Sequence, residues 1–99
     1  MPPINLKNAL TRHVRIAALT ESQVFALENG NRVGLMVYND SVESTLYLAV
    51  DRDATTELFT VRLRPGSLYE MPFEYFTAKV TGIWDDAEGY AQITEISDR

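Results

Sequence analysis

The sequence of 99 residues is long enough for one domain with one core. Hydrophobic residues make up 45% of it, as in an ordinary folded protein, and it contains no cysteine for disulfides or thiolate metal sites. The net charge is −5, although the first 19 residues carry three basic side chains and no acidic one. An acidic chain argues against nucleic acid as a partner, because phosphates need clustered lysine and arginine. No apolar run approaches the ~18 residues that span a bilayer, so no membrane partner is expected.

Residues 1–12 are predicted to form an extended N-terminal arm. Pro2 and Pro3 favour extended backbone at its start. Apolar side chains on a terminal arm need a surface to cover, so the arm either packs on its own domain or reaches a neighbouring molecule. Deletion of residues 1–12 is expected to leave the fold intact and to weaken assembly. The candidate interface residues of the arm are Ile4, Leu6, Lys7, Leu10 and Arg12.

Residues 13–99 are predicted to form a single β-sandwich domain. Apolar and polar residues alternate in short runs, which is the period of half-buried strands, and turn residues separate the runs. The strands are expected at 13–19, 23–27, 32–39, 45–50, 56–63, 67–70, 78–84 and 90–96. Within them, Met36, Tyr38 and Tyr47 are expected to point outward. About eight short strands with a turn signal every ~8–12 residues indicate an all-β fold, a compact antiparallel sandwich or barrel.

The clearest hairpin signal spans residues 80–95, VTGIWDDAEGYAQITE. Two apolar runs flank a polar turn that contains Gly89, and the first run holds the single tryptophan, Trp84. A lone tryptophan in a domain of this size normally packs in the core. The alternative is that Trp84 and Tyr90 are exposed platforms that stack on a host glycan.

The residues that carry chemistry are few. There is no cysteine nucleophile, the single histidine is His13, and no glycine-rich phosphate loop is present. These observations predict no catalytic residues and no cofactor. The weak candidates for calcium ligands are Asp51, Asp53 and Glu57, which lie in one loop and offer hard oxygen atoms. This loop lacks the glycine and the further ligands of an EF-hand, so no metal is expected. A second acidic group, Asp85, Asp86 and Glu88, falls in the predicted hairpin turn, where acids are common because they bond the local backbone.

A set of turn and core residues follows a characteristic order along the chain. They are Asn31-Arg32, Gly34-Leu35, Tyr38-Asn39, Leu46-Tyr47-Leu48, Leu63, Pro65-Gly66, Tyr69-Glu70, Pro72, Gly82, Trp84, Ala87, Gly89, Ala91 and Thr94-Glu95. This order, over residues 31–95, resembles the small β-sandwich structural proteins of tailed bacteriophage virions, such as capsid decoration proteins and head fibres. These residues define a scaffold and do not define a ligand.

The resemblance implies a virion structural protein without enzyme activity. Such proteins are often homotrimers at a symmetry axis of the shell. Because the chain is nearly all one domain, capsid decoration is favoured over an adsorption fibre. The implied partners are the major capsid protein and further copies of this chain, and the implied location is the capsid exterior after synthesis in the host cytoplasm. The alternative is a tail or fibre module that binds a host glycan through Trp84 and Tyr90.

Overall fold

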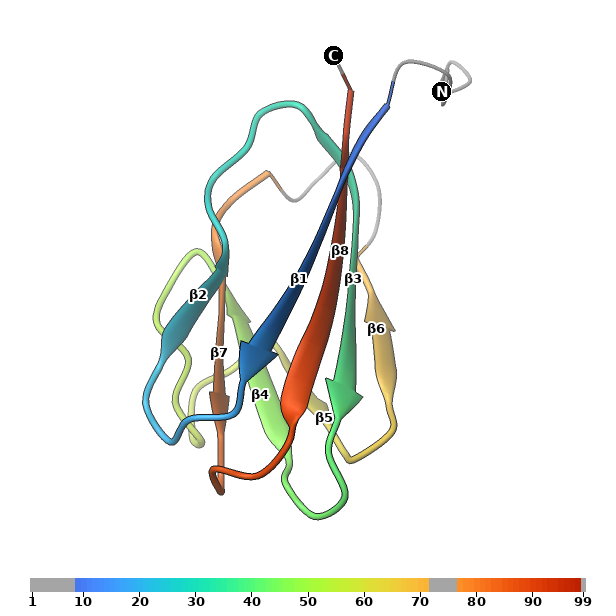
Figure 1. Cartoon of the computed structure of the whole chain (residues 1–99). Helices are drawn as coiled ribbons and strands as arrows, with labels where there is room; N and C mark the ends of the chain where they lie inside the picture. The colour runs from blue at the N-terminus through green and yellow to red at the C-terminus, as the bar shows by residue number, and fades with distance from the viewer. Residues whose placement is uncertain (1–8, 72–76, 99) are drawn as a thin grey trace.

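A computed structural model describes residues 9–71 and 77–98, and the statements below refer to them. The predicted all-β fold is confirmed: eight strands form two antiparallel four-stranded sheets packed face to face (Figure 1). Sheet A has the order β1-β8-β3-β6 and sheet B the order β2-β7-β4-β5. The strands are β1 (Leu10–Ala17), β2 (Gln23–Ala26), β3 (Arg32–Asp40), β4 (Leu46–Val50), β5 (Val61–Leu63), β6 (Leu68–Glu70), β7 (Val80–Trp84) and β8 (Tyr90–Ser97). No helix in the described part of the chain is long and apolar enough to cross a membrane.

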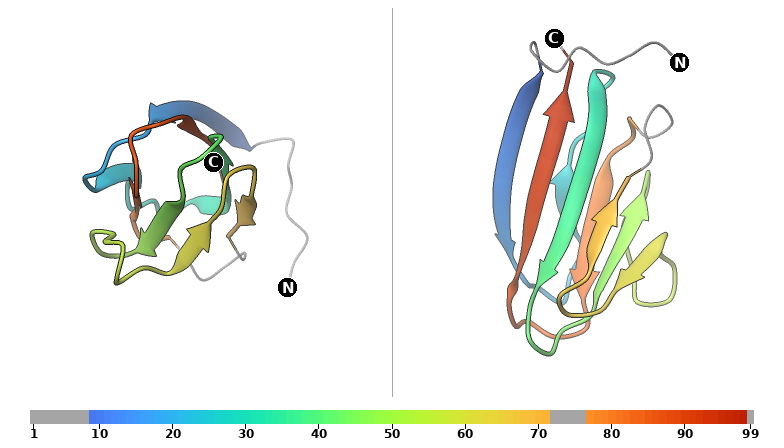
Figure 2. Two further views of the ribbon diagram at one scale, coloured as in Figure 1. Left: turned by 90° about the horizontal axis from the view of Figure 1, so that it is seen from below. Right: turned by 90° about the vertical axis from the view of Figure 1, so that its right-hand side faces the viewer.

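The strand pairing follows a simple rule. β1 pairs with β8, β2 with β7, β3 with β6 and β4 with β5, all antiparallel. The first four strands therefore pair with the last four in one long antiparallel ribbon. The ribbon is rolled so that successive strand pairs fall alternately in sheet A and sheet B. This is the eight-stranded jelly roll. Seen from its end, the roll is nearly closed (Figure 2).

The predicted hairpin at residues 80–95 is wrong. Both strands exist, but β7 lies in sheet B and β8 in sheet A, so they do not pair with each other. The turn between them is held by the β3–β4 loop instead. The carboxylate of Glu88 accepts hydrogen bonds from the amides of Val42, Glu43 and Ser44, at 2.7 to 3.2 Å. Gly89 has a φ of +92°, and a Cβ there would collide with backbone atoms of residues 40 and 41.

The core lies between the two sheets and follows the alternation of the sequence. Leu46 and Leu48 of β4 point inward, as predicted, with at most 1% of each exposed. Trp84 is 1% exposed and packs against Phe25, with ring centroids 5.5 Å apart. Gly82 leaves the space that the Phe25 ring occupies, since a Cβ at residue 82 would overlap that ring.

Two predicted strand boundaries differ from the structure. The strand expected at 56–63 is limited to β5, Val61–Leu63. The preceding loop folds over the outer face of sheet B, where the amide of Ala54 donates to Thr81 Oγ1 at 2.9 Å and Ala54 is buried. The loop before β5 thus packs on the outer face of sheet B, and these residues do not extend the β4–β5 ladder. At the other end, β1 begins at Leu10, inside the predicted arm, because Leu10, Thr11 and Arg12 pair with β8.

Candidate partner-binding groove

A groove of about 380 Å³ opens where the edge strands β1 and β2 of the two sheets diverge. β2 and the turn after it form one wall, and inward-facing side chains of β1 and β8 form the other. Its lining residues are Arg12, Val24, Phe25, Ala26, Leu27, Glu28, Asn29 and Glu95. We call it the β1–β2 groove.

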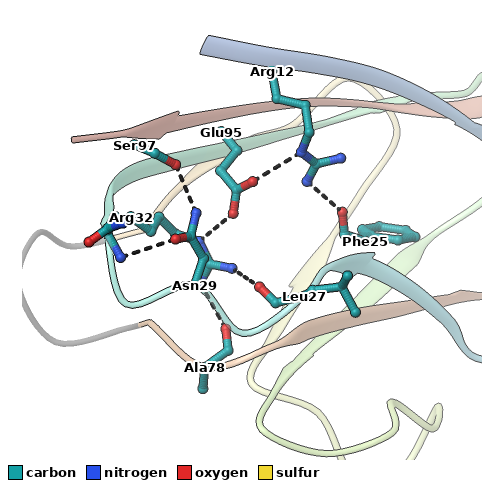
Figure 3. Close-up of polar contacts among 9 residues, drawn as sticks. Arg12, Phe25, Leu27, Asn29, Arg32, Ala78, Glu95 and Ser97 are labelled. Carbon is teal, nitrogen blue, oxygen red and sulfur yellow. Dashed lines mark hydrogen bonds and ion pairs between the residues drawn. The ribbon is translucent and has the colours of Figure 1, made fainter. Parts of the chain in front are cut away.

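Arg32 lies behind this groove with 1% of its side chain exposed. Its Nε donates to Glu95 Oε2 at 2.7 Å, its Nη1 to the Ala78 carbonyl at 2.8 Å and its Nη2 to the Leu27 carbonyl at 2.7 Å (Figure 3). The guanidinium thereby joins β8 of sheet A to the ends of two segments of sheet B. It connects the sheets at a place where no strand ladder does.

Glu95 completes the connection by accepting hydrogen bonds from two arginines. Arg12 donates from Nε to Glu95 Oε1 at 3.0 Å and from Nη2 to the Phe25 carbonyl at 3.2 Å. Burial by itself raises the pKa of Glu95, but hydrogen bonds and positive charge from Arg32 and Arg12 outweigh it and hold the pKa below its usual value. Glu95 is therefore ionised at neutral pH. We call Arg12, Glu95 and Arg32 the triad.

The triad is suited to holding the sheets together. A general base needs a pKa near the working pH, whereas the two arginines hold the pKa of Glu95 below its usual value. Among the described residues, every buried side-chain nitrogen and oxygen has a hydrogen-bond partner. The chemistry that the groove offers is a partly exposed guanidinium beside an apolar surface.

Exposed apolar side chains border the groove. Val24 is 47% exposed and Leu27 is 73% exposed. Leu10, which is 50% exposed, precedes Arg12 by two residues and so lies on the same face of β1. Apolar side chains around a guanidinium are typical of protein interfaces, in which arginine and large apolar residues are enriched.

The predicted interface residues fall into two groups. Ile4, Leu6 and Lys7 lie outside the described residues. Leu10 and Arg12 belong to β1 and not to an arm, which corrects the predicted arm boundary at residue 12. Arg12 is also a member of the triad, so part of its charge is already paired within the chain.

The candidate calcium ligands are not brought together. Asp51, Asp53 and Glu57 are all exposed, and no group of three potential ligands that could hold a metal ion occurs in residues 9–71 and 77–98. Asp53 instead lies 3.9 Å from the amine of Lys79. The second acidic group is taken up by backbone contacts: Asp85 accepts from the amide of Thr45, and Glu88 caps the β3–β4 loop.

The glycan platform of Trp84 and Tyr90 does not exist as predicted. Trp84 is buried between the sheets and donates its indole N–H to Asn39 Oδ1 at 3.3 Å. Tyr90 lies on the outer face of sheet A and is 38% exposed. Its ring is covered by the guanidinium of Arg15, whose central carbon lies 3.8 Å from the ring centroid. The core interpretation of Trp84 is confirmed.

Arg32 and Glu95 were not singled out from the sequence as a pair. The signal for Glu95 was present, because it follows Ala91 and Ile93 at a spacing of two on the inward face of β8. The signal for Arg32 was misleading, since strict alternation places it on the outer face with Gly34 and Met36. A bulge between Arg32 and Gly34 reverses that side and turns the side chain inward.

Comparisons with known proteins report the fold and not a family. No protein-family model matches the sequence, and no curated protein sequence matches it. A subunit of the Bacillus endospore appendages, described as disulfide-linked pili, is similar in structure with a TM-score of 0.52 and 16% identity over 92% of this chain and 88% of the other. An RmlC-like cupin from Shewanella frigidimarina has a TM-score of 0.49 and 15% identity over 93% and 68% of the two chains. Identities this low indicate a shared β-fold and carry no function with them.

Proposed function

We propose that this chain is a non-enzymatic structural protein of a tailed-bacteriophage virion, a capsid decoration protein that binds the assembled lattice of the major capsid protein. The virion role rests on the resemblance over residues 31–95, and the observation that supports a protein partner is the β1–β2 groove. Its apolar rim is exposed, and its buried side-chain polar atoms are hydrogen-bonded within the described residues. Such a surface favours the burial of another protein's apolar side chains over the chemistry of a small substrate.

The rim suits a contact with a neighbouring chain. Leu27 and Leu10 expose apolar area on either side of the groove. Within the described residues, the hydrogen bonds of Arg12 to Glu95 and Phe25 leave further guanidinium donors unused. A partner segment with an apolar side chain and an adjacent acidic group matches this pattern. The triad holds the groove walls in place, so less conformational entropy is lost on binding.

The similar pilus subunit gives limited support. The Bacillus endospore appendages form disulfide-linked pili, so a similar fold occurs in a structural assembly. The 99 residues of the present chain contain no cysteine, so no such covalent link forms through them. Assembly here would rest on non-covalent contacts, which many weak copies on a lattice strengthen through avidity.

Binding to the lattice would stabilise the shell by mass action. A protein that binds the assembled shell and not the free capsid subunit shifts the equilibrium toward the shell. The test uses capsids of the encoding phage prepared without this protein. We expect the protein to sediment with assembled capsids and not with free capsid subunits, and we expect Leu27→Asp to weaken this binding at least about tenfold, because it places a charge in an apolar contact.

Arg62→Glu is the matched control, because Arg62 is exposed on β5, away from the groove. It should bind capsids like the wild type. Absence of binding to assembled capsids, or electron-microscopy density for this protein only at the tail, would contradict the decoration role. Equal capsid binding by Leu27→Asp and the wild type would show that the β1–β2 groove is not the capsid-binding surface.

A further inference from the structure

The outer face of sheet A separates charge by strand. β1 presents His13 and Arg15 outward and no acidic group. At the other side of the sheet, β3 presents Asp40 and β6 presents Glu70, with no basic group between them. β8, in the middle, presents only uncharged residues. The face therefore has a basic half along β1 and an acidic half along β3 and β6. Figure 1 shows the order of these strands in the sheet.

Apolar side chains occupy the same face beside these charges. Tyr38 is 39% exposed and Leu68 is 53% exposed, and the two are cross-strand neighbours on β3 and β6. Met36 and Ile96 are half-buried on the same face, which confirms that Met36 and Tyr38 point outward. Exposed apolar side chains that share one sheet face with opposite charges suit a protein interface.

We propose that the outer face of sheet A binds the same face of a second copy of this chain. A two-fold axis in the plane of such an interface has two principal directions. An axis across the strands would stack β1 on β1 and place the basic halves against each other. An axis parallel to the strands stacks β1 of each copy on β6 of the other, so that basic and acidic halves meet in both places. The charge pattern selects the second arrangement.

The strand register specifies the contacts of that arrangement. His13 and Thr94 of β1 and β8 lie in one row with Met36 and Glu70 of β3 and β6. Reversing this row for the second copy places His13 opposite Glu70 of that copy. In the next row Arg15 comes opposite Leu68 and adjacent to Glu70. Arg15 is already held over the Tyr90 ring, so its guanidinium is fixed on the face before binding.

The size of the face agrees with a dimer contact. Three strands of eight or nine residues and the three-residue β6, spaced by about 4.8 Å, cover on the order of 450 Å² in projection. Their side chains raise the accessible area above the projected one, toward the ~800 Å² per partner of a standard interface. Aligned packing of two sheets face to face is also a common way to bury such a surface.

Charge reversal on the full chain tests this proposal. By sedimentation velocity, the wild type should have the mass of two chains, and Glu70→Arg should raise the dissociation constant at least about tenfold, because it places two basic groups together. The double variant Arg15→Glu with Glu70→Arg should recover most of the wild-type affinity. Tyr38→Asp should give a monomer, and far-ultraviolet circular dichroism should show that each variant remains folded.

Arg62→Glu again serves as the control, since Arg62 lies in sheet B and its reversal should leave the dimer unchanged. A wild type with the mass of one chain would overturn the proposal. So would an assembly, such as the trimer that the phage resemblance implies, that persists in Tyr38→Asp. Failure of the double variant to recover affinity would overturn the strand-parallel axis. These outcomes do not depend on capsid binding, so this proposal and the decoration role fail separately.

Discussion

At the scale of single residues, buried polar side chains close the two ends of the sandwich. The triad joins the sheets beside the β1–β2 groove, and Asn39 does the same at the opposite end of β3. Asn39 is fully buried, and its Nδ2 donates to the carbonyls of Ser44 and Leu63 at 2.8 and 2.9 Å. Each group replaces ladder hydrogen bonds where the sheets diverge. Such groups are costly to break, because Glu95 and the carbonyl partners of Asn39 are buried and would each lose a donor.

Arg32→Leu is expected to lower the free energy of unfolding by about 3–5 kcal/mol, because it leaves Glu95 charged, buried and bonded only to Arg12. Urea denaturation followed by tryptophan fluorescence measures the change. The exposed Arg62→Leu should cost less than about 0.5 kcal/mol. The double variant Arg32→Leu with Glu95→Leu should be more stable than the sum of the single effects predicts. Simple additivity would show that the pair does not act as one unit.

At the scale of elements, the loops decide how the strands connect. The β7–β8 turn is rich in acids, and its Glu88 caps the amides of the β3–β4 loop. Hydrogen bonds from the amides of Val42 and Glu43 hold the pKa of Glu88 below its usual value. This contact ties the end of β3 to the start of β8, which are neighbours in sheet A. The β7–β8 turn thus fastens β8 to β3, although in the sequence it connects β8 to β7.

Acidification should weaken this contact. A carboxyl whose pKa is lower in the folded state stabilises the fold above its unfolded pKa, and this stabilisation is lost as the pH falls through the folded value. For Glu88 the loss begins below the ordinary value of 4.5 and continues into more acidic solution. Glu88→Gln should be less stable than the wild type at neutral pH and should lose less stability on acidification. Urea midpoints across that range measure both effects.

The exposed carboxylate of Glu57 provides the control for this measurement, because it accepts no hydrogen bond from the described part of the chain. Glu57→Gln should follow the wild-type pH profile. A Glu88→Gln profile parallel to that of the wild type would contradict the capping role of the carboxylate.

At the scale of the whole molecule, the jelly roll makes the chain depend on both ends. β1 and β8 pair over their full lengths, from Leu10 with Ser97 to Ala17 with Tyr90. The first strand, β1, therefore forms the edge of sheet A and is held there by the last strand, β8. Contacts between residues that are far apart in sequence dominate such a fold, so the loss of either end affects the entire core.

Two truncations separate the arm from the fold. Deletion of residues 1–8 should leave the melting temperature nearly unchanged. Deletion of residues 1–12 removes three paired residues of β1 and one arginine of the triad, so it should cost on the order of 2 kcal/mol. Differential scanning calorimetry measures both. The expected loss of stability differs from the sequence-based expectation that deletion of residues 1–12 leaves the fold intact. Equal melting temperatures for the two truncations would support that expectation.

The period of the sequence determined a large part of this fold. Alternation in β3 and β4 identified Met36, Tyr38 and Tyr47 as outward residues, because side chains in a strand point to opposite faces with a period of two. The single tryptophan and the turn residues located the core and most strand ends. Alternation failed at Arg32, where one extra residue in a bulge reverses the faces, and at residues 56–60, where a loop packs on the outside of sheet B.

The sequence by itself therefore determined an all-β chain with about eight strands, a core around Trp84 and no evident catalytic set. Only the tertiary structure decided the partner of each strand, because residues 80–95 have the local pattern of a hairpin, yet β7 and β8 belong to different sheets. A short turn fixes that two strands are close, but the burial of both apolar faces decides which sheet each joins. The triad, the β1–β2 groove and the charge-sorted face of sheet A all arise from that choice, since each combines residues from distant parts of the chain.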